Sequence, residues 1–196
     1  MENPVILKMG DIMNEEEFFR FCQMNDTLNL ERDQYGNIIV MSPTGSNTGS
    51  FNLHLASSLY NWNLAQDFPG EVFDSSTGFT LPNGAVRSPD VSWVRKEKWE
   101  VLSPEDKERF APVCPDFIIE VRSQSDELPA LRDKMEEYIA NGCQLGWLID
   151  RFNQEVSVYR PQQSVEQFDT LAIRLSGEPV LPGFEIDLKK IINRLR

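Results

Sequence analysis

The sequence has few of the residues that build disulfide frameworks and histidine-rich metal sites. Its 196 residues include three cysteines and one histidine, His54. Cys22, Cys114 and Cys143 form neither an even set nor a C-x-x-C pair, which argues against a disulfide framework or a zinc cluster. A single histidine excludes metal sites built from several histidines and leaves any Ser-His-Asp scheme one candidate base.

Long apolar runs and a surplus of basic residues are also missing. No stretch approaches the ~18 apolar residues of a membrane span, and the N-terminus lacks the basic start and apolar run of a secretion signal. We therefore expect a cytoplasmic protein in a reducing compartment, without membrane contact. A net charge of −12 gives no footprint for non-specific nucleic-acid binding. Bound divalent cations, or a dimer that gathers its basic residues in one groove, could still bring phosphates to the protein.

The composition is that of a folded domain. Hydrophobic residues make up 40% of the chain and aromatic residues 10%, enough to fill one core. We expect a single domain over residues 1–196, in which a helix beginning near Asn14 and a hairpin, together spanning 10–45, pack on a core formed by 46–196. The segment "TGSNTGS" at 44–50 reads as a flexible turn.

The rest of the chain alternates between helical and strand patterns. The sequence predicts an amphipathic helix in which Phe51 and Leu55 recur at helical spacing, and then short strands over 71–100. A strand, a helix with a terminal glycine and a strand hairpin follow. Their order, with a closing helix, indicates a mixed α/β core. The later segments are 116–122, 125–142, 143–151 with 154–161, and 185–196.

Acidic side chains stand in two predicted strands. Glu120 follows the apolar run Phe117–Ile119 inside the strand at 116–122, where an unpaired buried carboxylate would cost several kcal/mol. Alternation of side chains places Glu120 and Arg122 on one face, and the same parity places Asp90 on one face of the strand in "PDVSWV". Two strand-borne carboxylates on a shared rim suit Mg²⁺, which takes one or two carboxylates plus waters and substrate phosphate.

A lysine on the predicted helix could reach these acids. Lys134 lies one turn after Leu131 and one turn before Tyr138, on the flank of the apolar stripe. A helix packed on the sheet could therefore aim its ammonium toward the carboxylates. There it could hold an attacking water or stabilise charge that develops on a phosphate.

Four segments carry a family resemblance. "RSPDVSWV", "APVCPDFIIEVRSQSD", "KMEEYIANGCQLGWLID" and "LSGEPVLPGF" closely resemble the Uma family, a branch of the PD-(D/E)XK nuclease superfamily, and the resemblance runs from "ERDQYG" to the C-terminus. It implies a restriction-endonuclease-like α/β fold, a mixed β-sheet flanked by helices. It also implies a Mg²⁺ site that Mn²⁺ can fill, and endonuclease hydrolysis of phosphodiester bonds in nucleic acid, expected to be DNA. A homodimer is expected because this fold commonly acts on two strands.

The resemblance assigns residues to the implied site. Asp90 matches the aspartate of the family's "PD", and Glu120 matches the acid of the second strand motif. Arg122 stands where the superfamily pattern has a lysine. Because arginine stays protonated, either Arg122 serves only as an electrostatic clamp or the role of the lysine has moved to Lys134. We favour the second alternative. Glu31 matches an acid near the N-terminal hairpin and is expected to be an outer metal ligand. The implied catalytic set is Asp90, Glu120, Lys134 and Arg122.

Each residue also has a plainer interpretation. Asp90 could form a turn after a proline, and Glu120 could form a structural ion pair with Arg122 or Lys134. Lys134 could be a solvated helix residue paired with acidic neighbours, and Glu31 a solvated acid at a hairpin end. A second function of a different class follows: a non-catalytic, nuclease-like module that binds or regulates a partner and keeps its acids as structural ion pairs. Metal binding through Asp90 and Glu120 separates the two.

Overall fold

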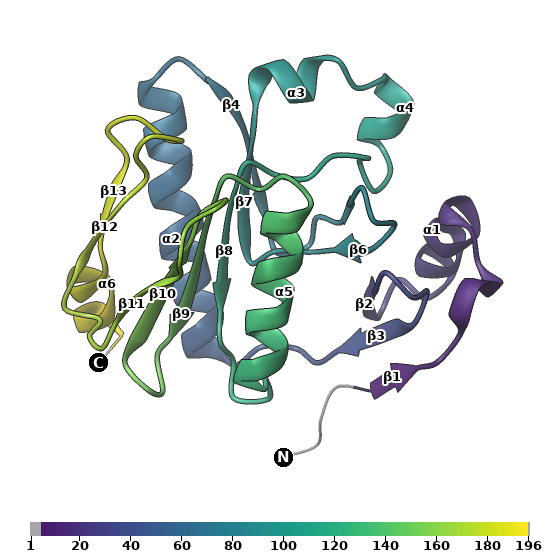
Figure 1. Cartoon of the computed structure of the whole chain (residues 1–196), viewed down its shortest axis with the longest axis horizontal. Coiled ribbons are helices and arrows are strands. Elements are labelled where there is room, and N and C mark those ends of the chain that lie inside the picture. Colours follow the sequence, from purple (N-terminus) through teal and green to yellow (C-terminus); the bar gives the residue numbers. More distant parts are fainter. Residues whose placement is uncertain (1–4, 196) are drawn as a thin grey trace.

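A central six-stranded sheet organises the molecule (Figure 1). The structure, a computed structural model, describes residues 5–195 apart from the side chain of Asp11. The β8 and β9 strands run parallel, and their other neighbours in this sheet are antiparallel. In spatial order the strands are β11 (Glu166–Phe168), β10 (Glu155–Tyr159), β9 (Leu145–Asp150), β8 (Phe117–Val121), β7 (Val91–Arg95) and β4 (Gly70–Asp74).

Two long helices lie on opposite faces of this sheet (Figure 1). The α5 helix (Leu128–Ala140) is the crossover that joins β8 to β9, and α2 (Ser46–Ala65) covers the other face. The strand β8 shows why both faces are filled. Phe117 and Ile119 belong to the cluster that includes the buried side chains of α2, whereas Ile118 belongs to the cluster that includes α5. The alternation expected for this strand is therefore confirmed.

A second sheet carries the N-terminal hairpin. Its order is β1-β3-β2-β6-β5, and Arg32 of β2 pairs with Val86 of β6, which joins the hairpin to the later chain. Helix α1 begins after Asn14, whose side chain forms a capping box with Glu17. The bounds are β1 (Val5–Leu7), α1 (Glu15–Met24), β2 (Asn29–Arg32), β3 (Ile38–Met41), β5 (Phe79–Thr80) and β6 (Val86–Arg87).

Short elements complete the structure. A two-stranded sheet and the closing helix pack behind the central sheet on the side of α2. The short elements are the 3-10 helix η1 (Gly10–Ile12), α3 (Lys96–Glu100), α4 (Pro104–Lys107), β12 (Arg174–Ser176), β13 (Glu185–Asp187) and α6 (Leu188–Arg194). No helix among residues 5–195 combines the length and apolar character needed to cross a membrane.

The mixed α/β class is confirmed, and three local expectations are wrong. The closing helix expected over 185–196 begins only at Leu188, because Glu185–Asp187 form β13. The segment 44–50 is not a turn throughout, because α2 begins at Ser46. Thr48 and Asn52 are buried in the first turns of this helix, so tertiary packing outweighs the low helix propensity of Gly, Ser and Asn. The short strands expected over 71–100 end at Arg95, where α3 begins.

Candidate active site

Asp90 and Glu120 come from neighbouring strands. The antiparallel β7 and β8 pair Val91 with Ile119 and Ser92 with Ile118. One step further along the same register places Asp90 opposite Glu120. Directly opposed residues of an antiparallel pair have Cβ atoms about 4.5–5.5 Å apart. The two strands that bear the predicted acids thus lie side by side, as their parity indicated.

Asp90 is held by two hydrogen bonds at the point where β7 begins. The Val121 backbone N–H donates to Asp90 Oδ2 at 2.7 Å, and Asn52 Nδ2 of α2 donates to Asp90 Oδ1 at 2.7 Å. Burial raises the pKa of the Asp90 carboxyl to about 6, although the Val121 amide and the nearby Lys134 act to lower it. Asp90 therefore does more than terminate a turn, because it ties β8 and α2 to β7.

Glu120 is buried on the α5 side of the sheet. Its Oε1 lies 2.8 Å from Lys134 Nζ and accepts a hydrogen bond from the Tyr138 hydroxyl at 3.2 Å. Burial, with repulsion from Asp90 and Glu31, outweighs the attraction of Lys134 and raises the pKa of Glu120 to about 8. No residue that the structure describes donates a hydrogen bond to Glu120 Oε2, so this oxygen is open to a further partner.

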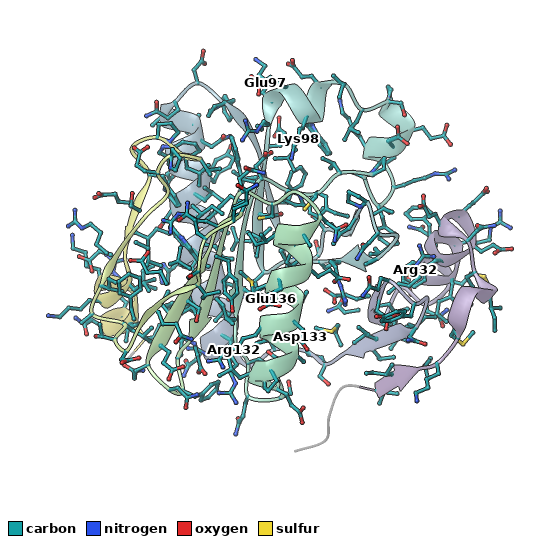
Figure 2. The ribbon with its side chains drawn as sticks, in the orientation of Figure 1. Arg32, Glu97, Lys98, Arg132, Asp133 and Glu136 are labelled. Atoms are coloured by element: carbon teal, nitrogen blue, oxygen red, sulfur yellow. The ribbon has the colours of Figure 1, made fainter. Side chains whose placement is uncertain are left out.

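Lys134 points into the cluster. Its Nζ bridges Glu31 Oε1 and Glu120 Oε1, each at 2.8 Å, and its side chain is buried. Although burial acts to lower the pKa of Lys134, the two carboxylates raise it above its ordinary value. Figure 2 labels Asp133 and Glu136, which are exposed on the same helix. The solvated interpretation of Lys134 is therefore wrong, and the inward direction inferred from helical spacing is confirmed.

Glu31 contacts both cations of this cluster. Only 3% of the residue is exposed, so the interpretation as a solvated hairpin acid is wrong. Its Oε1 accepts from the Ser88 N–H at 2.9 Å and from Lys134, and its Oε2 from Arg87 at 3.1 Å. Burial acts to raise the pKa of Glu31, but Lys134 and Arg87 hold it below the usual value. Because Lys134 contacts one oxygen of Glu31 and Arg87 the other, two cations already neutralise this carboxylate. The geometry therefore favours Glu31 as a support for Lys134 over an outer metal ligand.

Two members of the network were missed by the sequence reasoning. Arg87 of β6 contacts Glu31, and its Nε donates to Glu137 Oε2 of α5 at 2.6 Å. Arg87 stands three residues before Asp90 in "VRSPD", and its side chain is buried. The signal that could have identified Arg87 is a charged residue in a short β-rich segment next to "PD". Its partners lie in distant parts of the chain, which the local pattern does not reveal.

The cluster contains more negative than positive side chains. Four carboxyl groups surround two cations. When all six are ionised, the cluster holds an excess of two negative charges in a buried environment. The raised pKa values of Asp90 and Glu120 are the response of the protein to this excess. The carboxyl groups are Glu31, Asp90, Glu120 and Glu137, and the cations are Arg87 and Lys134.

Arg122 takes part in a different interaction. Its guanidinium lies 2.8 Å from Asp150 Oδ2, donates to the Asp126 carbonyl and packs over the Phe152 ring. Of the two ion pairs considered for Glu120, the one with Arg122 is therefore wrong, and the one with Lys134 is present. Both side chains follow the alternation of β8, but Arg122 comes after the last residue of the strand and turns toward the end of β9.

The Mg²⁺ that the resemblance implies can be tested against these side chains. Residues 5–195, without the side chain of Asp11, contain no group of three His, Cys, Asp or Glu residues placed to hold a metal ion. Two opposed carboxylates remain, Asp90 and Glu120, and Mg²⁺ commonly takes one or two carboxylates with waters and phosphate oxygens. The open oxygen of Glu120 and the excess of two negative charges also fit a divalent cation. The donor set therefore fits Mg²⁺ through Asp90 and Glu120.

Comparisons with known proteins agree with this fold. A family model described as "Uma2: Putative restriction endonuclease" matches residues 15–189. The chain is also similar to the crystal structure of a putative nuclease belonging to DUF820 from Anabaena variabilis ATCC 29413. The TM-score is 0.77 at 22% sequence identity, over 94% of this chain and 99% of that chain. The fold is therefore the expected restriction-endonuclease-like α/β fold. The comparison with curated proteins found no match.

Proposed function

The chain belongs to the Uma2 family, and from this premise we propose that it is a Mg²⁺-dependent endonuclease that hydrolyses phosphodiester bonds, with DNA as its substrate. The observation that carries the proposal is that Asp90, at the start of β7, lies opposite Glu120 of β8 in a buried cluster that has two surplus negative charges when fully ionised. Such a surplus is unfavourable without a cation. A divalent ion would neutralise it and would also meet the needs of the reaction.

Each side chain has a role in this proposal. The Asp90 and Glu120 carboxylates would hold Mg²⁺, and the bound ion would supply charge neutralisation and an oriented water. A bond forms from the water oxygen to phosphorus as the bond from phosphorus to the leaving sugar oxygen breaks. The water gives up a proton to solvent, and the leaving oxygen takes a proton from solvent. Lys134 stabilises the charge that develops on the phosphate oxygens. Because its pKa is raised, Lys134 stays protonated and donates hydrogen bonds instead of taking a proton.

The remaining charged groups fix this arrangement. Glu31 accepts from both Lys134 and Arg87, and Glu137 holds the other side of Arg87. These ion pairs restrict the position of the Lys134 ammonium. Arg122, which contacts Asp150, lies outside this proposed reaction set. The role that the superfamily pattern gives to a lysine on β8 therefore passes to Lys134.

The charge of the whole chain shapes how the substrate would bind. A net charge of −12 does not attract phosphates over a broad surface. Substrate binding would therefore depend on the bound cation and on the few basic side chains near it. Cleavage of both strands of a duplex requires two sites, and we propose that a homodimer provides them.

The completeness of the ion pairs favours a second candidate function. Lys134 and Arg87 are satisfied by carboxylates within the described chain, and the net charge is −12. A non-catalytic module that binds or regulates a partner would keep such a network for structural reasons. In that case, Asp90 and Glu120 would show no affinity for a divalent cation.

Calorimetric titration with Mn²⁺ and a plasmid-nicking assay separate the two functions. The wild type should bind Mn²⁺ and nick plasmid DNA. Glu120→Gln keeps the shape of the side chain but removes one charge, so it should lose both properties. Glu136→Gln, an exposed substitution on α5, is the matched control and should keep both. A wild type that does not bind Mn²⁺ would refute the enzyme and favour the module.

A further inference from the structure

Two buried asparagines face the sheet from α2, and they differ in one respect. The Asn63 amide is satisfied on both sides, because its Nδ2 donates to the Gly70 carbonyl at 2.9 Å and its Oδ1 accepts from Trp93 Nε1 at 3.0 Å. Asn52 is 8% exposed and donates to Asp90, but its Oδ1 is buried and has no hydrogen-bond partner among the residues that the structure describes. Asn63 therefore has a complete structural role, and Asn52 has an unused acceptor.

An unsatisfied buried acceptor is unfavourable and calls for an explanation at this position. Asn52 Oδ1 belongs to an amide whose other end is 2.7 Å from Asp90 Oδ1. Amide oxygens are hard, neutral donors of the kind that Mg²⁺ and Mn²⁺ accept alongside carboxylates. We propose that Asn52 Oδ1 is the third protein oxygen of the divalent cation site formed by Asp90 and Glu120.

This assignment rests on the proposed function and adds a ligand from a third element. Asp90 precedes β7, Glu120 is on β8, and Asn52 is on α2. An asparagine leaves the charge of the site unchanged, so two carboxylates can balance one divalent cation. A mixed set of two carboxylates and one amide oxygen consists of the hard oxygen donors that Mg²⁺ and Mn²⁺ accept.

Calorimetric titration with Mn²⁺ on four proteins tests the assignment. Asn52→Leu removes the oxygen at similar size and should weaken Mn²⁺ binding at least about tenfold relative to the wild type. Asn52→Asp keeps an oxygen and adds a charge, so it should bind Mn²⁺ at least as tightly as the wild type. Asn63→Leu is the matched control on the same helix. It should lower the melting temperature and leave the Mn²⁺ affinity within about twofold.

Each outcome has one meaning. If Asn52→Leu binds Mn²⁺ like the wild type, or if Asn63→Leu weakens binding equally, the assignment of Asn52 is overturned while the nuclease proposal stands. If Asn52→Asp loses binding like Asn52→Leu, donation to Asp90 is what matters and Asn52 Oδ1 is not a ligand. A wild type without Mn²⁺ affinity overturns both proposals, so the two failures are distinguishable. Far-ultraviolet circular dichroism on each variant confirms that the titrated protein is folded.

A different observation concerns the outer side of α2. From Gln34 to Gln66 the sequence contains no Asp, Glu, Lys or Arg, although 26% of the chain is charged. Leu53 is 67% exposed, and Tyr60 and Leu64 are each 50% exposed. Their spacing of seven and four residues places them on one side of the helix. We call this side the uncharged α2 face, which consists of Leu53, Ser57, Tyr60, Asn61 and Leu64.

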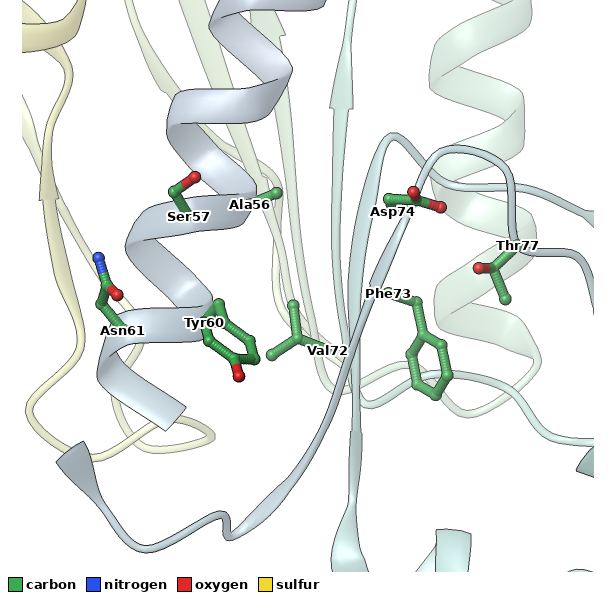
Figure 3. Close-up of a pocket in the computed structure, with 8 residues that line it drawn as sticks. All are labelled: Ala56, Ser57, Tyr60, Asn61, Val72, Phe73, Asp74 and Thr77. Atoms are coloured by element: carbon green, nitrogen blue, oxygen red, sulfur yellow. The ribbon is translucent and has the colours of Figure 1, made fainter. Parts of the chain in front are cut away.

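A hollow beside this face enlarges it. A cavity of about 610 Å³ lies between α2 and β4, and its lining includes Ser57, Tyr60 and Asn61 of the helix and Val72 and Phe73 of the strand. Figure 3 shows Tyr60 next to Val72. The strand β4 is the edge of the central sheet. The hollow offers space into which an aromatic or aliphatic side chain from another chain can fit.

The charge of the protein identifies the occupant of this surface. Two copies with a net charge of −12 repel one another, so contact between copies is favoured where no charge is present. Charged residues are depleted and tyrosine is enriched at the centre of protein interfaces. Glu71 and Asp74 oppose direct pairing of β4 with another β4. We infer that the uncharged α2 face binds the same face of a second copy of this chain.

Light scattering after size-exclusion chromatography tests this interface. The wild type should elute with the mass of a dimer, and Tyr60→Glu with Leu64→Glu should elute as a monomer. Val101→Glu, with Leu28→Glu, adds the same charge at exposed apolar positions outside this face and should stay dimeric. Raising the salt from about 0.15 to about 1 M should strengthen the dimer by screening repulsion. A monomeric wild type, or an equal effect of the control, would overturn the interface without affecting the Mn²⁺ result.

Discussion

At the scale of residues, the cluster joins groups whose protonation depends on burial. Burial raises the pKa of Asp90 to about 6 and that of Glu120 to about 8, whereas Lys134 and Glu31 are held in their charged forms. Asp90 and Glu120 are therefore the two members most responsive to pH. A divalent cation at these oxygens would compete with protons for the same sites.

The sign of the resulting pH dependence can be stated. An acid whose pKa is higher in the folded protein binds more protons there than in the unfolded chain, so its contribution to stability falls as pH rises. For Asp90 the loss should occur between about 4 and about 6, and for Glu120 between about 4.5 and about 8. Without metal, the free energy of unfolding should decrease over this range, while Mn²⁺ affinity should increase. Urea unfolding and calorimetry across pH 5–8 measure both.

Glu120→Gln supplies the control for this pH dependence. The glutamine does not titrate, so the decrease in stability above pH 6 should be reduced in the variant. Lys134 keeps Glu31 as a partner in Glu120→Gln, so the variant is expected to fold. An identical pH profile for the wild type and the variant would show that Glu120 does not titrate in this window.

The sequence located the main residues but not their partners. Strand alternation in β8 and helical spacing in α5 correctly predicted that Glu120 and Lys134 face inward. Alternation could not predict that Arg122 turns to Asp150, because the strand has ended there. It also could not predict that Arg87 reaches Glu31, since that contact depends on how two sheets meet. Local periodicity defines the direction of a side chain, and tertiary packing defines what it meets.

At the scale of elements, Lys134 links α5 to two sheets. Its ammonium contacts Glu31 of β2 in the N-terminal sheet and Glu120 of β8 in the central sheet. Lys134→Met would leave two buried carboxylates without this cation. Removing one partner of a buried charge pair destabilises by ~3–5 kcal/mol. We therefore expect a loss of about that size in the free energy of unfolding at neutral pH, measured by chemical denaturation.

A surface lysine gives the matched comparison for this substitution. Lys96 is exposed and, within the described part of the chain, pairs only with Glu100 one turn away on α3. Lys96→Met should therefore change the free energy of unfolding by less than about 1 kcal/mol. The loss in Lys134→Met should shrink as pH falls, because the abandoned carboxylates become protonated. An equal effect of the two substitutions would show that the buried bridges contribute little.

Element boundaries were predictable where a local signal exists. Asn14 begins α1 with a capping box, and Gly142 follows α5 with a φ of +108°, as a glycine after a helix C-terminus does. The start of α2 at Ser46 lacks such a signal, because Gly45 precedes it without a side-chain cap. The sequence patterns predicted neither β12 nor β13, which are three residues each. Short elements depend on packing more than on their own sequence.

At the scale of the whole molecule, the net charge of the chain and the charge of the fully ionised cluster are both negative. The chain carries −12 overall, and its buried cluster has two negative charges beyond its cations when all six groups are ionised. Family membership and the α/β fold could be predicted from the order of motifs along the chain. The sequence could not predict the proposed role of Asn52 Oδ1 as third oxygen of the cation site, nor the role of Glu31. Both roles arise where separate elements meet around the cluster.

Binding of a divalent cation should stabilise the whole fold. A ligand that binds only the folded state raises the free energy of unfolding by RT ln(1 + [L]/Kd), about 2.7 kcal/mol at one hundred times Kd. The melting temperature of the wild type should therefore rise with the logarithm of Mn²⁺ concentration. Glu120→Gln should melt near the metal-free wild type, because relief from surplus charge offsets the lost contact to Lys134, and it should show no rise with Mn²⁺. Thermal unfolding of both proteins with chelator and with increasing Mn²⁺ gives the comparison. If the wild type is indifferent to Mn²⁺, or if Glu120→Gln is stabilised equally, Asp90 and Glu120 do not form a metal site.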